Sequence, residues 1–266
     1  MMTQSEFDQL AAAGHNRIPL VLETFADLDT PLSVYLKLAH RPFTYLLESV
    51  VGGERFGRYS FIGLACAERI EARQGTLRRL LRDARGSDVC LERAEGADPF
   101  EFARAWLRRQ RVAPAPEALR FAGGLVGYFG YETVRHVEPR ALRGAKPDPL
   151  GTPELLLLVS DELAVVDNLR GKLYLVVYAD PREPGAYAAA RARLEGLRAR
   201  LATPLAESVV LGEAAPAGRE ARATVERSFT EAQFLAAVRR AKEYVYAGDC
   251  MQVQISQRSS RAFEAP

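Results

Sequence analysis

The chain has few of the residues that build the commonest catalytic and metal sites. It contains three cysteines and three histidines among 266 residues. The cysteines are odd in number and widely spaced, which indicates neither a disulfide framework nor a zinc site; they are Cys66, Cys90 and Cys250. The histidines lie far from one another and beside no nucleophile motif, so no catalytic triad is predicted; they are His15, His40 and His136.

Long apolar runs and an excess of one charge are also missing. The longest aliphatic run, Leu155 to Val159, is far too short to cross a bilayer, and the amino terminus has no basic region followed by an apolar core. The net charge of +2, from 36 basic and 34 acidic residues, provides no field that would recruit nucleic acid or an anionic membrane. We therefore expect a cytoplasmic protein with specific partners. Only four of the basic residues are lysines, and this arginine excess indicates codon bias.

The glycines do not have the spacing of a phosphate-binding loop. Gly124, Gly127 and Gly130 recur at every third residue and form neither GxGxxG nor a Walker motif. In a strand, such glycines instead predict close approach of another backbone. No HExxH or EF-hand spacing is present either, so no metal site is predicted within these residues.

The most informative stretch is Tyr45 to Gly63, with the sequence YLLESVVGGERFGRYSFIG. An apolar strand ends directly at Glu48 and Ser49, a bend with Gly52 and Gly53 follows, and a second strand runs to Gly63. The pattern predicts a strand, a turn and a strand.

Two interpretations of Glu48 and Ser49 are open from the residues alone. The carboxylate can hold an ammonium group by a charge-assisted hydrogen bond, while the hydroxyl donates to or accepts from a ligand. Alternatively, the two side chains satisfy backbone amides of the turn, which is what an acid and a serine at a strand end usually do.

Three motifs in a fixed order carry a resemblance to a known family. They are LLES followed by GRYSFIG (residues 46–63), FAGGLVGYFGYE (121–132) and AGDCMQVQISQR (247–258). Together they resemble anthranilate synthase component I, a chorismate-utilising enzyme. Proteins of that family continue through segments that carry catalysis, so we expect this chain to be an amino-terminal portion.

The resemblance implies an α+β fold with two packed antiparallel β-sheets and surrounding helices. Residues 1–202 would form an amino-terminal regulatory domain, and residues 228–266 would begin the chorismate-binding domain. The segment 203–227 is rich in Ala, Pro, Gly and Glu without a sustained period, which is typical of a linker.

Local patterns predict the individual elements. The expected strands are 19–25, 121–128, 154–159, 162–166, 173–178 and 251–256, and the expected helices are 31–39, 76–83, 99–111 and 184–201. Thr30 and Asp98 are expected to cap two helices, and Ser228 with Glu231 fits a capping box. The helix after this box carries one apolar stripe that we expect to pack in a core; it consists of Phe234, Leu235, Val238, Ala241 and Val245.

The function implied by the resemblance is conversion of chorismate to anthranilate and pyruvate. Ammonia would come from a glutamine amidotransferase subunit, so a hetero-oligomer is expected. Mg²⁺ would be the cofactor, with its ligands beyond residue 266. L-Tryptophan would inhibit the enzyme by binding at Ser49, Glu48 and Leu47.

The same resemblance assigns Gln252 a catalytic role. Related isochorismate-forming enzymes have a water-activating lysine at the matching position. Glutamine has no basic nitrogen, which suits a site that uses ammonia as the nucleophile. A glutamine that satisfies strand backbone is the alternative at this position.

Two further hypotheses are open. An aminodeoxychorismate synthase component I-type enzyme has a similar fold and similar early motifs. A free-standing tryptophan-binding regulatory module would use the same pocket without any catalysis.

Overall fold

The computed structural model describes residues 1–48, 57–116, 119–140, 148, 150–205 and 225–262. The chain divides into two compact units, Met1–Ala206 and Glu207–Pro266. Ser49, Gly52 and Gly53 therefore lie outside the described residues.

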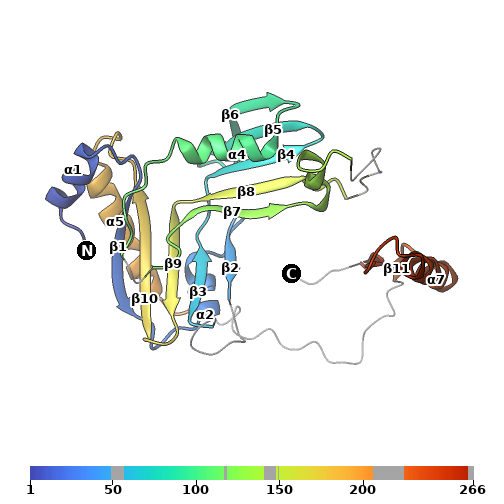
Figure 1. The fold of residues 1–266 in the computed structure, drawn as a ribbon. Coiled ribbons are helices and arrows are strands. Elements are labelled where there is room, and N and C mark those ends of the chain that lie inside the picture. The colour runs from blue at the N-terminus through green and yellow to red at the C-terminus, as the bar shows by residue number, and fades with distance from the viewer. Residues whose placement is uncertain (49–56, 117–118, 141–147, 149, 206–224, 263–266) are drawn as a thin grey trace. The chain divides into compact units, whose positions relative to one another are not determined.

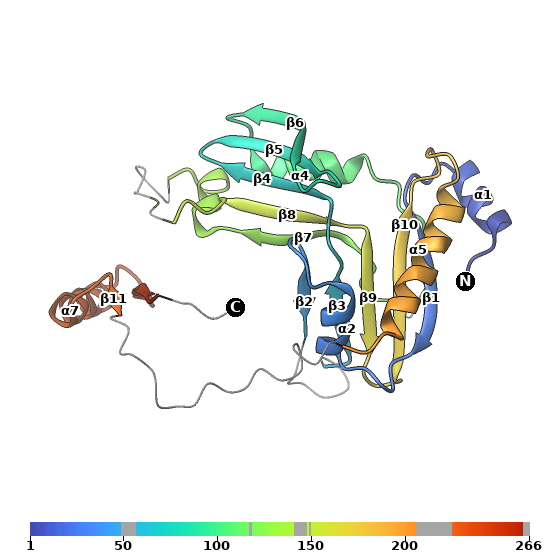
Figure 2. The ribbon, with the colours of Figure 1, turned by 180° about the vertical axis from the view of Figure 1, so that it is seen from behind.

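The first sheet of unit 1 has five antiparallel strands in the order β1-β10-β9-β3-β2. Their bounds are Ile18–Phe25 (β1), Tyr45–Leu47 (β2), Tyr59–Gly63 (β3), Glu162–Asp167 (β9) and Lys172–Ala179 (β10). Helices α1 (Gln4–Ala12), α2 (Pro31–Leu38) and α5 (Ala186–Leu201) pack against the sheet, and Figure 2 shows α2 and α5 beside it. Ile18, Leu20 and Leu175 from the sheet meet Leu194 and Leu197 from α5 in a fully buried core.

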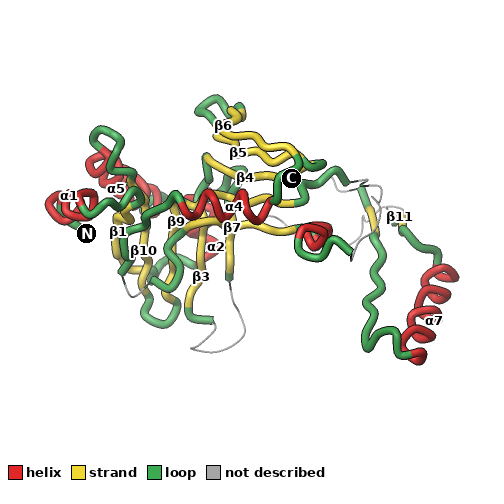
Figure 3. Tube along the Cα trace, turned by 45° about the horizontal axis from the view of Figure 1, so that its top comes forward, coloured by secondary structure: helices red, strands yellow, loops and turns green. Residues whose placement is uncertain are grey.

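The second sheet is also antiparallel, in the order β6-β5-β4-β8-β7. Its strands are Glu68–Arg73 (β4), Thr76–Arg82 (β5), Asp88–Glu95 (β6), Gly124–Phe129 (β7) and Leu155–Ser160 (β8). Helix α4 (Pro99–Arg108) lies along one face of this sheet, as Figure 3 shows, and the short 3₁₀ helix η1 (Tyr131–His136) follows β7. Phe102 and Trp106 of α4 pack on Ile70, Leu77 and Leu155.

The two sheets are joined at a corner where β8 leads into β9 through the single residue Asp161. β8 lies between β4 and β7, and β9 lies between β10 and β3, so the corner joins an inner strand of each sheet. In Figure 1 the strands of the two sheets run across one another. This arrangement confirms the predicted fold class of two antiparallel sheets with surrounding helices.

Most of the predicted elements are present in unit 1. Thr30 caps α2 with Pro31 in its first turn, and Asp98 caps α4 by accepting a hydrogen bond from the Phe100 amide at 2.8 Å, as expected. All three cysteines are free, and Cys66 is buried. No helix among the described residues has the length and apolar character needed to span a membrane.

The predicted helix at 76–83 is wrong, because these residues form β5. Gln74 and Gly75 have φ angles of 49° and 75°, and this left-handed turn returns the chain antiparallel to β4. Leu77 and Leu80 then point to opposite faces of the sheet, and both are buried. A strand with apolar residues on both faces has the same local composition as a short amphipathic helix.

Smaller differences have similarly local causes. Helix α1 and strand β6 were not predicted from the sequence. Helical spacing predicts Phe102, Ala105 and Trp106 on one face of α4, but Ala103 is buried with Phe102 and Trp106 and Ala105 is exposed. The residue at 103 lies beside Phe102 on the face that meets the sheet.

Unit 2 contains β11 (Glu226–Arg227), α7 (Glu231–Ala247) and β12 (Ser259–Ser260). The capping box is at Thr230 and Gln233, so the predicted pair Ser228 and Glu231 is wrong. Ser228 instead pairs with Arg258: its amide donates to the Arg258 carbonyl oxygen, and its hydroxyl accepts from the Arg258 amide, both at 2.9 Å.

Two expectations for unit 2 are not met within its described residues. Residues 251–256 form no strand, because an extended segment is a strand only when a neighbour pairs with it. Val253 and Ile255 instead line a groove together with Phe234 and Val238 of α7. No residue of α7 is buried, so the apolar stripe does not pack in a core here.

Gly63 provides a test of the first sheet. A Cβ at this position would overlap the ring of Tyr45, which lies across Gly63 on the neighbouring strand. We expect Gly63→Ala to lower the free energy of unfolding by about 1–3 kcal/mol, because the ring must move. Urea unfolding of the full chain, followed by circular dichroism, measures this change.

Gly196→Ala is the matched control. Gly196 lies within α5, where an added Cβ has no atom within 4 Å. Alanine there should stabilise the chain by about 0.5–1 kcal/mol through helix propensity. Equal effects of the two substitutions would contradict the close packing of Tyr45 on Gly63.

Candidate functional site

The predicted strand pair around LLES is present at the edge of the first sheet. β2 pairs antiparallel with β3, with Tyr45 opposite Gly63, Leu46 opposite Ile62 and Leu47 opposite Phe61. β2 is the edge strand and has only three residues, so its position depends on β3. The strand–turn–strand prediction is confirmed for its two strands, and the bend lies outside the described residues.

Glu48 directly follows β2 and is exposed, and Leu47 is 49% exposed. Leu47 and its partner Phe61 lie on the same face of the sheet, because directly opposed residues of antiparallel strands share a face. Glu48 therefore follows directly in sequence on a half-exposed leucine that shares its face with Phe61. Ser49, the third predicted effector residue, lies outside the described residues.

Aromatic residues cover the sheet beside Leu47. The ring of Phe61 meets the ring of Phe121 edge-on, with centroids 5.4 Å apart and an interplanar angle of 88°. Tyr59 lies 6.1 Å from Phe61, and the group packs on Val165 and Val176. Edge-to-face pairs of this kind fix ring orientation, so the apolar surface is preformed.

Tyr45 ties the edge strand to the corner between the sheets. Its hydroxyl lies 2.7 Å from the hydroxyl of Ser160, which is fully buried at the end of β8. Burial raises the pKa of Tyr45 to about 12, so the phenol is neutral and keeps its hydrogen bond. The chain just before LLES is thus held to both sheets.

The start of β3 is held by a buried ion pair. Asp167 is completely buried at the end of β9, and it accepts from Arg58 Nε at 3.0 Å and from a terminal nitrogen of Arg58 at 2.6 Å. Burial alone would raise the pKa of Asp167, but the hydrogen bonds from Arg58 and from the amides of Arg170 and Leu169 outweigh it and lower the pKa. The Arg58 guanidinium also lies over the Tyr59 ring, 4.7 Å from its centroid.

The glycine-rich segment allows close approach along β8, as its sequence predicts. A Cβ at Gly127 would overlap the carbonyl oxygen of Leu156, and one at Gly130 would lie 2.9 Å from that of Glu154. Gly124 has open space, and its φ of 120° is what requires glycine there. The motif therefore serves packing of β7 on β8.

A polar cavity of about 260 Å³ lies in unit 1, where the beginning of β1, the α4 helix and the end of β10 meet. Arg17 is central to it: its guanidinium lies 5.5 Å from the Trp106 ring and 5.2 Å from the Tyr178 ring, and it pairs with Asp161. Burial lowers the pKa of Arg17. Sequence reasoning missed this cavity, since nothing in the local pattern joins residues so far apart.

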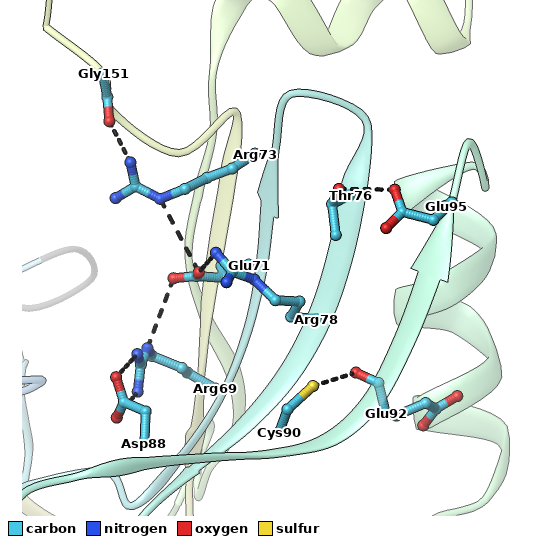
Figure 4. Close-up of polar contacts among 10 residues, drawn as sticks. All are labelled: Arg69, Glu71, Arg73, Thr76, Arg78, Asp88, Cys90, Glu92, Glu95 and Gly151. Atoms are coloured by element: carbon cyan, nitrogen blue, oxygen red, sulfur yellow. Dashed lines mark hydrogen bonds and ion pairs between the residues drawn. The ribbon is translucent and has the colours of Figure 1, made fainter.

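A second charged cluster binds the strands of the second sheet together (Figure 4). Arg69 donates two hydrogen bonds to Asp88, at 2.9 and 2.5 Å, and Arg78 donates to Glu71 at 2.6 Å. Arg69 and Glu71 are buried, and the bonds raise the pKa of Arg69 and lower that of Asp88. Paired opposite charges of this kind have a structural role across β4, β5 and β6.

Gln252 of unit 2 is exposed in a segment without regular structure. Its neighbour Val253 lines an apolar groove of about 420 Å³ along α7, with Phe234, Val238 and Ile255. The catalytic role of Gln252 stays a prediction. Among the described residues, no cluster of three or more His, Cys, Asp and Glu side chains could hold a metal ion.

The family model for chorismate binding enzymes matches residues 45–266, and the chain belongs to this family. The chain is 50% identical over 266 residues to anthranilate synthase component 1 of Neisseria meningitidis serogroup C, covering 99% of this chain and 52% of the relative. It is 49% identical over 264 residues to the protein of that name from Pseudomonas aeruginosa, again covering 99% and 52%. The chain thus spans about half the length of these curated relatives.

A solved structure shows the same fold. The crystal structure of anthranilate synthase component I from Streptococcus pneumoniae TIGR4 matches with a TM-score of 0.52 and 19% identity, covering 85% of this chain and 46% of that one.

The buried pair predicts how stability depends on pH. Because the pKa of Asp167 is lowered from its ordinary value of 3.8, its carboxylate contributes stability above that value and loses it as the pH falls through the lower folded pKa. We expect the free energy of unfolding to drop as the pH falls below about 4, and to drop less in Asp167→Asn. Urea unfolding at a series of pH values measures both slopes.

At neutral pH, Asp167→Asn should lower the free energy of unfolding by about 2–3 kcal/mol, since it leaves Arg58 without its charged partner. Asp249→Asn, at an exposed position in unit 2, controls for the change in net charge. Identical pH slopes for the original chain and Asp167→Asn would contradict the lowered pKa.

Proposed function

We propose that this chain belongs to the large subunit of a cytoplasmic anthranilate synthase that acts in tryptophan biosynthesis. The observation that carries the proposal is 50% identity to anthranilate synthase component 1 along 99% of the chain. The relatives described above all carry that name, which favours this activity over an aminodeoxychorismate synthase type.

The reaction would join chorismate and ammonia and release anthranilate, pyruvate and water. Ammonia adds to the ring as the hydroxyl group leaves as water, and elimination of the enolpyruvyl side chain as pyruvate makes the ring aromatic. A glutamine amidotransferase subunit would supply the ammonia, so the working enzyme would be a hetero-oligomer. Gln252 would lie near the substrate, where a side chain without a basic nitrogen leaves water unactivated.

Mg²⁺ would neutralise the substrate carboxylate and stabilise developing charge when bound. The described residues do not form a site for it. Its ligands would come from beyond residue 266.

L-Tryptophan would bind at the edge of the first sheet and inhibit the enzyme. Glu48 would pair with its ammonium group, Ser49 would hydrogen-bond the same polar end, and Leu47 would contact the indole. Two features support this placement: Glu48 is exposed at the strand end, and Leu47 lies opposite Phe61. Both ends of the strand pair are fixed, by Tyr45 and by Arg58.

Substitutions at this edge test the proposal in the full-length enzyme. Ser49→Ala and Glu48→Gln should each raise the tryptophan concentration for half-inhibition by about tenfold or more, because a charge-assisted hydrogen bond contributes about 1.5–3 kcal/mol. Turnover and the KM for chorismate should stay within about twofold. Steady-state assays of anthranilate fluorescence at several tryptophan concentrations measure all three quantities.

Glu183→Gln is the control, because Glu183 is an exposed acid beyond the opposite end of β10. It should leave inhibition and turnover unchanged. If Ser49→Ala and Glu48→Gln reduced activity and inhibition in parallel, the effector assignment would be wrong.

A further inference from the structure

The position of Glu48 depends on contacts made elsewhere in the sheet. β2 is a three-residue edge strand, and within the described part of the chain it pairs with β3 alone. β3 in turn pairs with β9, with Tyr59 opposite Asp167 and Ser60 opposite Val166. Contacts that hold the beginning of β3 in place therefore also hold β2, and with it the strand end at Glu48.

Asp167 is unusual for a residue at the end of a strand. A carboxylate is rarely completely buried unless its charge is paired, and Asp167 has no exposed surface. It accepts hydrogen bonds from two amides of its own turn, Leu169 and Arg170, each at 3.2 Å. An asparagine could serve that turn equally well. The two-pronged bond to Arg58 is the feature that needs a carboxylate.

Asn168 holds the same segment through its backbone and side chain. Its amide donates to the Arg58 carbonyl oxygen at 2.8 Å, and its side-chain nitrogen lies 3.2 Å from the Ser60 hydroxyl. Ser60 is completely buried. The turn after β9 thus makes hydrogen bonds to both the main chain and a side chain of the GRYS segment.

We propose that Arg58 and Asp167, with Asn168, are positioning residues for the tryptophan site at Glu48. This inference rests on the proposed effector function. None of the three contacts the effector; they hold the first residues of β3 so that Phe61 and the strand end at Glu48 keep their places. Loss of the contacts among Arg58, Asp167 and Asn168 would increase the mobility of the sheet edge where tryptophan binds and would leave the other strands of the sheet paired.

The test uses the full-length enzyme with Arg58→Lys, which keeps the charge and removes the two-pronged bond. We expect the tryptophan concentration for half-inhibition to rise about 10-fold to 100-fold, because a binding site tolerates only small displacements of its contacts. The kcat and the KM for chorismate should change less than about twofold. Asn168→Ala, at an exposed position, should shift inhibition in the same direction by a smaller factor.

Arg193→Lys is the matched control. Arg193 makes the same kind of two-pronged bond to Glu162, at 2.8 and 2.7 Å, at the other end of β9. It should lower the melting temperature without tryptophan less than Arg58→Lys does, because this pair is partly exposed, and it should leave inhibition unchanged. Equal inhibition in Arg58→Lys and in the original enzyme, with a lowered melting temperature, would show a merely structural pair and overturn the inference.

Glu48→Gln, measured in parallel, separates this inference from the function on which it rests. If Glu48→Gln relieves inhibition and both Arg58→Lys and Asn168→Ala leave it intact, only the positioning role is wrong. If Glu48→Gln has no effect, the effector site itself is misplaced and the inference fails with it. Asp167→Asn is a third variant. If it does not fold, Arg58→Lys and Asn168→Ala still test the inference.

Discussion

The passage of one chain from β8 into β9 is the constraint on which unit 1 depends. With only Asp161 between them, an inner strand of each sheet is continued into an inner strand of the other. If the two sheets moved apart, either β8 or β9 would have to break its pairing with the strands on both of its sides. Ser160 at the end of β8 and Leu163 in β9 are completely buried on either side of this corner. The hydrogen bond from Tyr45 adds the edge strand to it.

This constraint gives the LLES strand an unusual combination of properties. An edge strand of three residues has little pairing of its own, yet its two sides are fixed by different parts of the fold. Tyr45 is anchored to the second sheet, and the neighbouring strand is anchored at Arg58 to the turn after β9. An exposed carboxylate can therefore be presented at a defined place without being buried itself, which is what recognition of a small charged molecule needs.

Sequence patterns predicted the elements whose cause is local. Thr30 with Pro31 and Asp98 mark helix starts through their own capping chemistry. Strand β5 was predicted as a helix because both of its faces are buried by partners that are distant in sequence. The LLES motif located the candidate site through family resemblance. Its supports at Asp167 and Ser160 depend on register and topology, which no short window of sequence contains.

The arginine-rich composition acquires a geometric meaning from the ion pairs. Arg58, Arg69 and Arg193 each grip a carboxylate with two nitrogens at once. An ammonium group is a single point of charge and cannot reproduce that planar fork. At these positions a substitution of arginine by lysine would preserve the net charge of the chain and still remove a contact that holds a strand in place. Lysine therefore cannot replace arginine at every basic position of this fold. Where a guanidinium makes two hydrogen bonds to one carboxylate, its planar shape requires arginine, whatever the nucleotide composition of the gene favours.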